Sequence, residues 1–463
     1  MRKGFPELAC AGLMLATAGK ALAAQPPFPD LAYAGTPDAI ALVPPDVSGF
    51  GVSAVTAVAL PDGRLWLVGS AVNDGAGGGE RLPRPAFAML TASGAPDASF
   101  GPNHDGLTIF DQPNSSAVDA VRESGTRLVY VGSASGPIAM IGRITDAGAP
   151  DTSFDGDGQR FIGGNAFLAG ATEAIFQGVA LQPDGKILAV GAAAALVNGT
   201  PNICTAVMRF NAEDGSSDAS FGTAGHVCIA PENGTAGPLS EGAKIALLAD
   251  GRILIAGFSV HTGSSSTDFS VARLMPNGDP DATFGPAHDG WAFVAFDEGG
   301  TLTDMANTIA LDAQGRIIVA GFVDSSTGAR TGVARLLADG QPDPTFGTQG
   351  RVELDTVAGA QNLVALPNGE IFTGGSSTTP GDFRGVAAML RSDGTLDPRF
   401  GEGGIFEQSD AVNPPDYFSS GPRVLAGDYI YWIGGTTDTH GAMAVARAVL
   451  PMFFDGFEAP PAD

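Results

Sequence analysis

Short apolar runs alternate with glycine-containing turns along nearly the whole chain. In one example, residues 65–69 form an apolar run that follows a Pro-Asp-Gly turn at residues 61–63. The same order of turn, apolar run and Gly recurs, and the runs end at Gly69, Gly132, Gly191, Gly257, Gly321, Gly374 and Gly434. Runs this short, bounded by Gly and rich in β-branched residues, predict strands, and Asp-Gly between two of them predicts a tight hairpin. The pattern therefore predicts an all-β protein.

A second motif, Asp-x-x-Phe, follows each of the first six runs. Its copies are Asp97/Phe100, Asp151/Phe154, Asp218/Phe221, Asp281/Phe284, Asp343/Phe346 and Asp397/Phe400. A third apolar run, such as residues 269–274, lies between the two motifs, so each repeat of about 60 residues supplies about four short strands. Several runs are apolar at consecutive positions, which predicts strands buried on both faces. Seven such repeats predict a seven-bladed β-propeller with four-stranded antiparallel blades.

The two ends of the repeat array complement each other. The seventh repeat has a third run at residues 442–449 but no Asp-x-x-Phe after it. Residues 29–35, which include Asp30 and Tyr33, resemble the missing motif, and residues 38–43 could supply the outer strand. An N-terminal strand in the last blade would close the ring and remove two exposed sheet edges. The propeller is accordingly expected to span residues 24–450.

This order of motifs resembles the delta-60 repeat family: an Asp-Gly turn, an apolar run ending in Gly, Ala-Arg-Leu, and then Asp-x-x-Phe-Gly. The resemblance covers about residues 30–449. The sequence departs from the pattern at Met89 and Met389, which replace the Arg of the third run, and the second repeat lacks the leading Pro-Asp. The resemblance implies a β-propeller of the kind found in exported bacterial proteins, and it implies little about chemistry.

The chain ends predict export. Arg2 and Lys3 precede an apolar stretch at residues 8–19, and Ala21-Leu22-Ala23 fits a cleavage site. Residues 1–23 are therefore expected to be a signal peptide, and the mature protein is expected to be secreted or periplasmic. Residues 451–463 form a C-terminal tail outside the repeats. Its Asp455-Gly456-Phe457-Glu458 segment is similar to short endings of some exported bacterial proteins, although a frayed terminus is the favoured interpretation.

The acidic net charge of the chain limits the kinds of partner that it is expected to bind. The 463 residues carry 24 Lys+Arg against 50 Asp+Glu, a formal net charge of −26, which disfavours nucleic acid and anionic membranes. No apolar run is long enough to span a bilayer, and a monomer is expected.

No cofactor motif is present. Residues 155–158, Asp-Gly-Asp-Gly, lack the layout of an EF-hand, so a turn is favoured over a calcium site there.

Five Arg residues of the third run recur with the Asp of Asp-x-x-Phe, so a structural role is favoured over catalysis. The predicted pairs are Arg143–Asp151, Arg209–Asp218, Arg273–Asp281, Arg335–Asp343 and, across the closure, Arg447–Asp30. Each pair would fasten the turn between the third and fourth strands. The alternative is a ring of Arg side chains that lines the central channel and binds an anion.

Cys204 and Cys228 lie in strand-like segments of one repeat. Export permits a disulfide between them, and two buried free thiols are the alternative.

The favoured function is a binding or interaction scaffold whose ligand, an unknown protein, glycan or small molecule, meets the loops of one face or the mouth of the channel. The most variable segments, residues 72–85 and 193–203, are the first candidates for contacts. A hydrolase or lyase with carboxylates at the channel mouth is the runner-up, and no catalytic residue can be chosen. A surface or matrix structural protein is the third interpretation. Enzymatic activity is the less favoured outcome.

Overall fold

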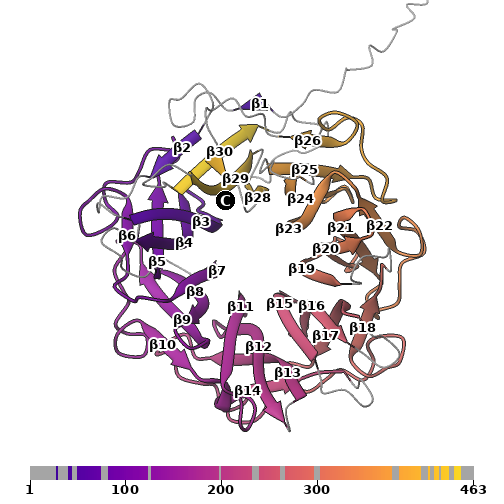
Figure 1. Ribbon diagram of the computed structural model, residues 1–463, viewed down its shortest axis with the longest axis horizontal. Helices are drawn as coiled ribbons and strands as arrows, with labels where there is room; N and C mark the ends of the chain where they lie inside the picture. The colour runs from indigo at the N-terminus through magenta and orange to yellow at the C-terminus, as the bar shows by residue number, and fades with distance from the viewer. Residues whose placement is uncertain are drawn as a thin grey trace, which may run out of the picture.

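A computed structural model shows strands arranged in a ring, with the first strand of each repeat nearest the centre (Figure 1). The structure describes residues 28–29, 40–43, 50–73, 82–123, 127–197, 200–231, 239–260, 266–296, 303–377, 385–407, 416–417, 422–426, 429–436 and 443–449. Among these, no helix has the length and apolar character needed to cross a bilayer.

Four of the sheets are separate four-stranded antiparallel blades in which strand order follows chain order. The first repeat contains β3 (Phe50–Ala59), β4 (Leu65–Asn73), β5 (Pro83–Leu90) and β6 (Leu107–Ile109). The second contains β7 (Ser116–Arg122), β8 (Arg127–Ala134), β9 (Ile138–Thr145) and β10 (Gln159–Ile162). The fifth contains β19 (Asp304–Leu311), β20 (Ile317–Ser325), β21 (Gly328–Leu336) and β22 (Arg351–Leu354). The sixth contains β23 (Val357–Ala365), β24 (Ile371–Ser377), β25 (Gly385–Leu390) and β26 (Ile405–Glu407).

The third and fourth repeats share one eight-stranded sheet. The third contains β11 (Glu173–Leu181), β12 (Ile187–Val197), β13 (Thr200–Phe210) and β14 (His226–Ile229). The fourth contains β15 (Leu239–Leu247), β16 (Ile253–Val260), β17 (Asp268–Leu274) and β18 (Trp291–Val294). A short 3₁₀ helix, η1 (Gly164–Ala166), precedes β11.

The last sheet has six strands. It combines β1 (Phe28–Pro29) and β2 (Ile40–Val43) with β27 (Asp416–Tyr417), β28 (Pro422–Ala426), β29 (Tyr429–Thr436) and β30 (Met443–Val449). β2 runs antiparallel to β30, with Ile40 opposite Ala446 and Val43 opposite Met443. The N-terminal part and the last repeat therefore share a sheet. Asp30 and Tyr33 lie outside the described residues.

The prediction of seven separate four-stranded blades is wrong. The described strands form six sheets, and four of these are four-stranded antiparallel blades. One physical reason is a single parallel pair, Ile203 opposite Leu239, which joins β13 to β15 and merges two repeats. The other is that both N-terminal strands add to β30 while β27 and β28 both pair with β29. Counting sequence repeats does not reveal such pairings.

The Phe of each Asp-x-x-Phe motif is a wedge between neighbouring repeats. Phe100, Phe154, Phe221, Phe284, Phe346 and Phe400 are all buried. Five of them pack against a Gly in the third-to-fourth-strand turn of the next repeat, for example Phe154 against Gly215. A Cβ on Gly215 would lie 2.9 Å from the Phe154 ring, and its φ is +73°. The wedge therefore requires Gly on the partner repeat.

Candidate functional site

Four of the five predicted Arg–Asp pairs are in contact. The distances from Arg Nε to Asp Oδ2 are 2.9 Å for Arg143–Asp151, 2.7 Å for Arg209–Asp218, 2.8 Å for Arg273–Asp281 and 2.7 Å for Arg335–Asp343. The fifth pair, Arg447–Asp30, lies outside the residues whose side chains are described.

Each of these guanidinium groups also extends into the following repeat. Arg335 Nη1 donates a hydrogen bond to the backbone oxygen of Ser392 at 2.6 Å, and its Nη2 donates to Thr345 Oγ1. Its guanidinium carbon lies 4.6 Å from the centre of the Phe346 ring. Arg143, Arg209 and Arg273 make the same contacts to Ala212, Pro276 and Ala338. Because these guanidinium groups are buried between repeats, they do not form the anion-binding ring considered as the alternative. We refer to each as an arginine staple.

A second cation, which was not predicted from the sequence, lies at the same carboxylates. A basic residue directly follows the Asp-Gly or Gln-Gly turn in four repeats, and Arg127 follows Gly125-Thr126 in the second; each lies near the motif Asp. The contacts are Arg64–Asp97 at 3.4 Å, Arg127–Asp151 at 3.3 Å, Lys186–Asp218 at 2.8 Å, Arg252–Asp281 at 3.1 Å and Arg316–Asp343 at 3.3 Å. The recurrence of this basic residue in the aligned repeats was the signal that could have revealed it.

Because these contacts lower the pKa of the motif Asp residues, they make the free energy of unfolding depend on pH. Burial alone would raise the pKa of Asp281, but hydrogen bonds from Thr283 and Arg252 and the charge of Arg273 hold that pKa far below its ordinary value. The pKa of Asp218 is lowered in the same way by Lys186 and Ser220. A carboxyl whose pKa is lower in the folded state stabilises that state above the unfolded pKa of 3.8, and the contribution is lost as the pH falls through the folded pKa.

We therefore expect the free energy of unfolding to fall as the pH is lowered from 5 to 2.5, measured by urea titration. Asp281→Asn removes one linked carboxyl, so its stability should be lower at pH 5 and should decline less steeply than that of the unchanged protein. Because acidification also reduces the repulsion within a chain of net charge −26, the difference between the two slopes is the decisive quantity. Equal slopes would contradict the assignment.

Cys204 of β13 and Cys228 of β14 form a disulfide with Cα atoms 5.5 Å apart. The bond joins the third and fourth strands of the third repeat, where Ala206 lies opposite Cys228. In the predicted contact segment at residues 193–203, the described residues are strand, because residues 193–197 continue β12 and residues 200–203 belong to β13. Most of the other predicted contact segment, residues 74–81, lies outside the described residues.

Strands β7, β11 and β15 lie near the centre of the ring (Figure 1), and polar side chains that they carry are in contact. Lys244 Nζ lies 2.5 Å from Asp119 Oδ1, and the Val179 backbone N–H donates to Asp119 Oδ2 at 3.0 Å. Gln177 Nε2 donates to Glu241 at 3.3 Å, and burial raises the pKa of Glu241. Asp119 and Lys244 neutralise each other across β11. We therefore interpret this cluster as a structural link between the inner strands β7, β11 and β15.

The Asp-Gly-Asp-Gly turn at residues 155–158, for which a calcium site was the less favoured interpretation, takes part in protein contacts. Asp157 Oδ1 accepts a hydrogen bond from the Gln159 backbone N–H at 2.9 Å, and Asp155 lies 3.5 Å from Arg160. In the described ranges, no three His, Cys, Asp or Glu side chains are grouped in a way that could hold a metal ion.

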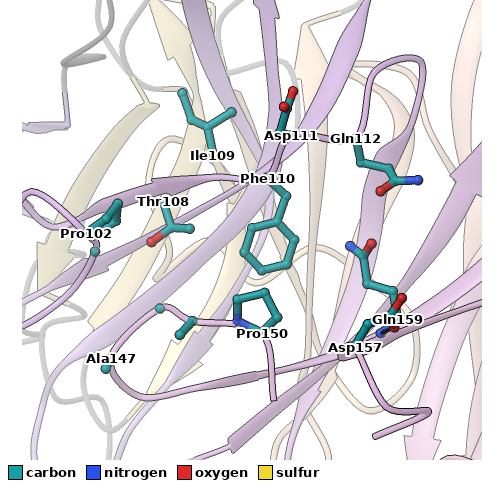
Figure 2. A pocket seen from close by; sticks show the side chains of 13 residues that line it. Pro102, Thr108, Ile109, Phe110, Asp111, Gln112, Ala147, Pro150, Asp157 and Gln159 are labelled. Atoms are coloured by element: carbon teal, nitrogen blue, oxygen red, sulfur yellow. Dashed lines mark hydrogen bonds between the residues drawn. The ribbon is translucent and has the colours of Figure 1, made fainter. Parts of the chain in front are cut away.

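A pocket of about 390 Å³ lies between the outer strand of the first repeat and that of the second (Figure 2). β6 and the residues after it contribute Thr108, Ile109, Phe110, Asp111 and Gln112. The second repeat contributes the turn at residues 147–150 together with Asp157 and Gln159. Figure 2 shows the Phe110 ring between these two walls, directed toward Pro150. This volume is within the range of small-molecule sites.

The next junction holds a longer side chain at the position that Thr108 occupies here. In the second repeat, Arg160 donates to the backbone oxygen of Gly215 at 3.0 Å and to Ser217 Oγ, both in the third repeat. Counted from the Gly that precedes the outer strand, the position of Arg160 is occupied by Thr108 in the first repeat. Gly148 and Pro150 correspond to Gly215 and Ser217. The short Thr108 side chain leaves the space beside this turn unfilled.

The Thr108 hydroxyl is unusual in this position. The side chain is buried, and Oγ1 has no hydrogen-bond partner in the described part of the chain. A Cβ on Gly148 would lie 2.5 Å from Oγ1, so Gly is needed beside it. The third and fifth repeats carry Val227 and Val352 at the same position, and both pack against the corresponding Gly. Because an unpaired buried hydroxyl costs roughly 1–3 kcal/mol, Val would be the more stable choice for structure alone.

The remaining polar groups lie toward the second repeat and the rim. Gln159 Nε2 donates to Tyr130 Oη at 2.7 Å, and burial raises the pKa of Tyr130, so its phenol is neutral. Asp157 is exposed at the rim, and Asp111 there is paired with Arg84 at 2.5 Å. This pocket was not predicted from the sequence. Its signal was the position of Phe110, where other repeats have the aliphatic residues Ile162, Ile229, Val294 and Leu354.

One family model, which describes a β-propeller, matches part of the sequence. Residues 182–221, 248–284 and 314–346 match the model of a domain of unknown function, DUF5122, described as a beta-propeller. No curated protein matches the sequence. Among solved structures, the polysaccharide lyase Uly1 is 10% identical with a TM-score of 0.47, covering 86% of this chain and 90% of that chain. Drosophila semaphorin 2a is 12% identical with a TM-score of 0.47, covering 89% of this chain and 75% of that chain. Likeness this remote says nothing about the ligand.

Proposed function

We propose that the protein is a binding propeller whose small-molecule ligand occupies the pocket between β6 and β10. One observation carries this proposal: the groove that Arg160 fills between the second and third repeats stays open between the first and second. The open groove is a concave site with an apolar floor and a few polar groups, the usual composition of a ligand pocket.

Filling the pocket should abolish binding without unfolding the protein. Thr108→Arg places at the first junction the residue that occupies the second, so the variant should fold with a thermal midpoint close to that of the unchanged protein. A ligand present at 100 times its Kd stabilises the folded state by about 2.7 kcal/mol. Such a ligand, found by thermal shift in a small-molecule library, should raise the midpoint of the unchanged protein and leave that of Thr108→Arg unaltered.

Ser326→Arg is the matched control, because it adds the same charge in an exposed turn between β20 and β21. This variant should respond to the ligand like the unchanged protein. Equal stabilisation of the Thr108→Arg variant would place the ligand elsewhere, and the proposal would fail.

Other expectations from the sequence are carried forward as proposals. We infer export from residues 1–23, so binding would take place in the periplasm or outside the cell. The repeats that match the DUF5122 model support assignment of the whole array to delta-60-type repeats. We also propose a monomer that needs no cofactor.

A further inference from the structure

We propose that the pocket between β6 and β10 binds an organic cation, whose apolar body lies against Phe110 and whose ammonium group lies at the rim beside Asp157. This inference rests on the proposed binding function and adds the chemical class of the ligand. It is carried by the difference between the two carboxylates of the lining, of which one has a cationic partner and the other has none among the described residues.

The carboxylates of Asp111 and Asp157 line different walls of the pocket. Asp111, which follows β6, lies 2.5 Å from Arg84, so the charges at this edge of the rim offset each other. Asp157, which precedes β10, accepts a hydrogen bond from the Gln159 backbone N–H but forms no ion pair with any described residue. Figure 2 shows Asp111 and Asp157 on opposite sides of the Phe110 ring. The second-repeat side of the rim therefore keeps a negative charge.

The basic residue closest to Asp157 along the chain does not neutralise it. Arg160 follows Gln159 in β10, and successive side chains of a strand point to opposite faces. Gln159 lines the pocket, whereas Arg160 donates to the Gly215 carbonyl of the third repeat and is paired with Asp155 at 3.5 Å. Arg160 therefore leaves the charge of Asp157 in place at the pocket.

The charge of Asp157 also acts on the aromatic residues around the pocket. Burial raises the pKa of Tyr130, and the negative charge of Asp157 adds to that rise. The ring centres of Tyr130 and Phe110 are 6.3 Å apart, so this field extends to the neighbourhood of Phe110. A field that disfavours a phenolate favours a cation at the same place and opposes an anion. The formal net charge of −26 for the whole chain acts in the same direction.

The rest of the lining suits an apolar body. Pro102, Ile109, Phe110 and Pro150 provide apolar surface, and Figure 2 shows the Phe110 ring directed toward Pro150. Because Asp157 is exposed, an ammonium group beside it keeps much of its hydration while the attached hydrocarbon leaves water. A cation of this kind gains from both parts of the pocket and avoids the cost of a fully buried charge.

The test compares three compounds of similar shape at pH 7: phenethylamine, 2-phenylethanol and 3-phenylpropionate, which are a cation, a neutral molecule and an anion. NMR titration of the full protein measures the three affinities. Because an exposed ion pair contributes little, the cation should bind about three-fold more tightly than the alcohol, and the alcohol about three-fold more tightly than the anion. Salt at about 1 M should reduce both ratios, because the Debye length falls to about 3 Å.

Two substitutions in the same turn locate the charge that selects the cation. Asp157→Asn removes the charge and keeps the side-chain shape, so it should lower the affinity for the cation to that for the alcohol. Asp155→Asn is the matched control, because it removes an equal charge that is paired with Arg160 outside the pocket. Asn tolerates the φ of 51° at this position, and the control should keep the preference for the cation.

A third variant tests the apolar part of the site. Phe110→Leu introduces the residue that the fifth repeat carries at the same position, Leu354. It should weaken all three compounds alike and leave the ratios between their affinities unchanged. A loss confined to the cation would contradict the placement of the apolar body against Phe110.

The remaining outcomes separate this inference from the proposed function. A cation that binds no more tightly than the alcohol would overturn the inference, as would an unchanged preference for the cation in Asp157→Asn. If the anion binds most tightly and Thr108→Arg abolishes that binding, the ligand class is wrong while the pocket stands as a binding site. If none of the three binds but another small molecule binds in a manner sensitive to Thr108→Arg, the conclusion is the same. If no small molecule binds to the pocket, both proposals fail.

Discussion

Replacement of Arg335 by Met should lower the free energy of unfolding by about 3 kcal/mol, the lower end of the range for breaking a buried ion pair. Arg335 is 1% exposed and holds Asp343, the Thr345 hydroxyl and the Ser392 carbonyl of the next repeat. Its removal leaves the buried Asp343 carboxylate with Arg316, which lies 3.3 Å away. The loss should therefore be large but less than that of an isolated buried charge. Urea denaturation monitored by fluorescence or circular dichroism measures it.

The sixth repeat suggests a rescue for this variant. Met389 stands there in place of the staple Arg, and the motif Asp397 is held instead by Arg399, two residues further along. Thr345 is the corresponding position in the fifth repeat, so Arg335→Met with Thr345→Arg should recover part of the lost stability. Arg330→Met is the control, because Arg330 forms more exposed pairs with Glu353 and Asp355 and should cost less than about 1 kcal/mol. Equal effects of the Arg330 and Arg335 variants would refute the staple interpretation.

Removal of the disulfide should have an effect of similar size. Cys204 and Cys228 are separated by 24 residues, and closing a loop of this length stabilises a folded chain by about 3 kcal/mol through restriction of the unfolded state. Cys204→Ala with Cys228→Ala should therefore lower the free energy of unfolding by about that amount. The measurement is urea denaturation of the double variant beside the oxidised protein.

Reduction of the unchanged protein provides the control. Dithiothreitol should shift its unfolding midpoint toward that of the double variant and should leave the double variant itself unmoved. A double variant as stable as the oxidised protein would show that the link between β13 and β14 is not needed in the third repeat.

Much of the local structure could be predicted from the sequence, because the repeat supplies many copies of the same signal. The hairpin turns, the short strands and the Arg–Asp partners each recur at fixed spacing, so one copy supports the next. The number of separate sheets could not be predicted in this way. A single parallel pair of residues, Ile203 opposite Leu239, joins the third and fourth repeats into one sheet. Because this pair does not recur in the other repeats, the repeating pattern of the sequence does not predict it.

The candidate binding pocket was unpredictable for the opposite reason. It depends on Thr108, Phe110 and Gln159, each of which departs from its counterparts in other repeats. A departure seen in sequence alone could equally be neutral drift at a surface position. Only the contact of Arg160 with the third repeat shows what fills the next junction at the position of Thr108, and that contact joins residues more than fifty positions apart.

The arginine staples have a direction along the chain. Arg143, Arg209, Arg273 and Arg335 each donate to a carbonyl of the repeat that follows, and no staple among them points backward. When one repeat frays, the repeat before it loses an acceptor for a buried cation, whereas the repeat after it keeps its own staple intact. Amide hydrogen exchange initiated by loosening the sixth repeat should thus spread toward the fifth and fourth, so that the ring melts against the direction of synthesis.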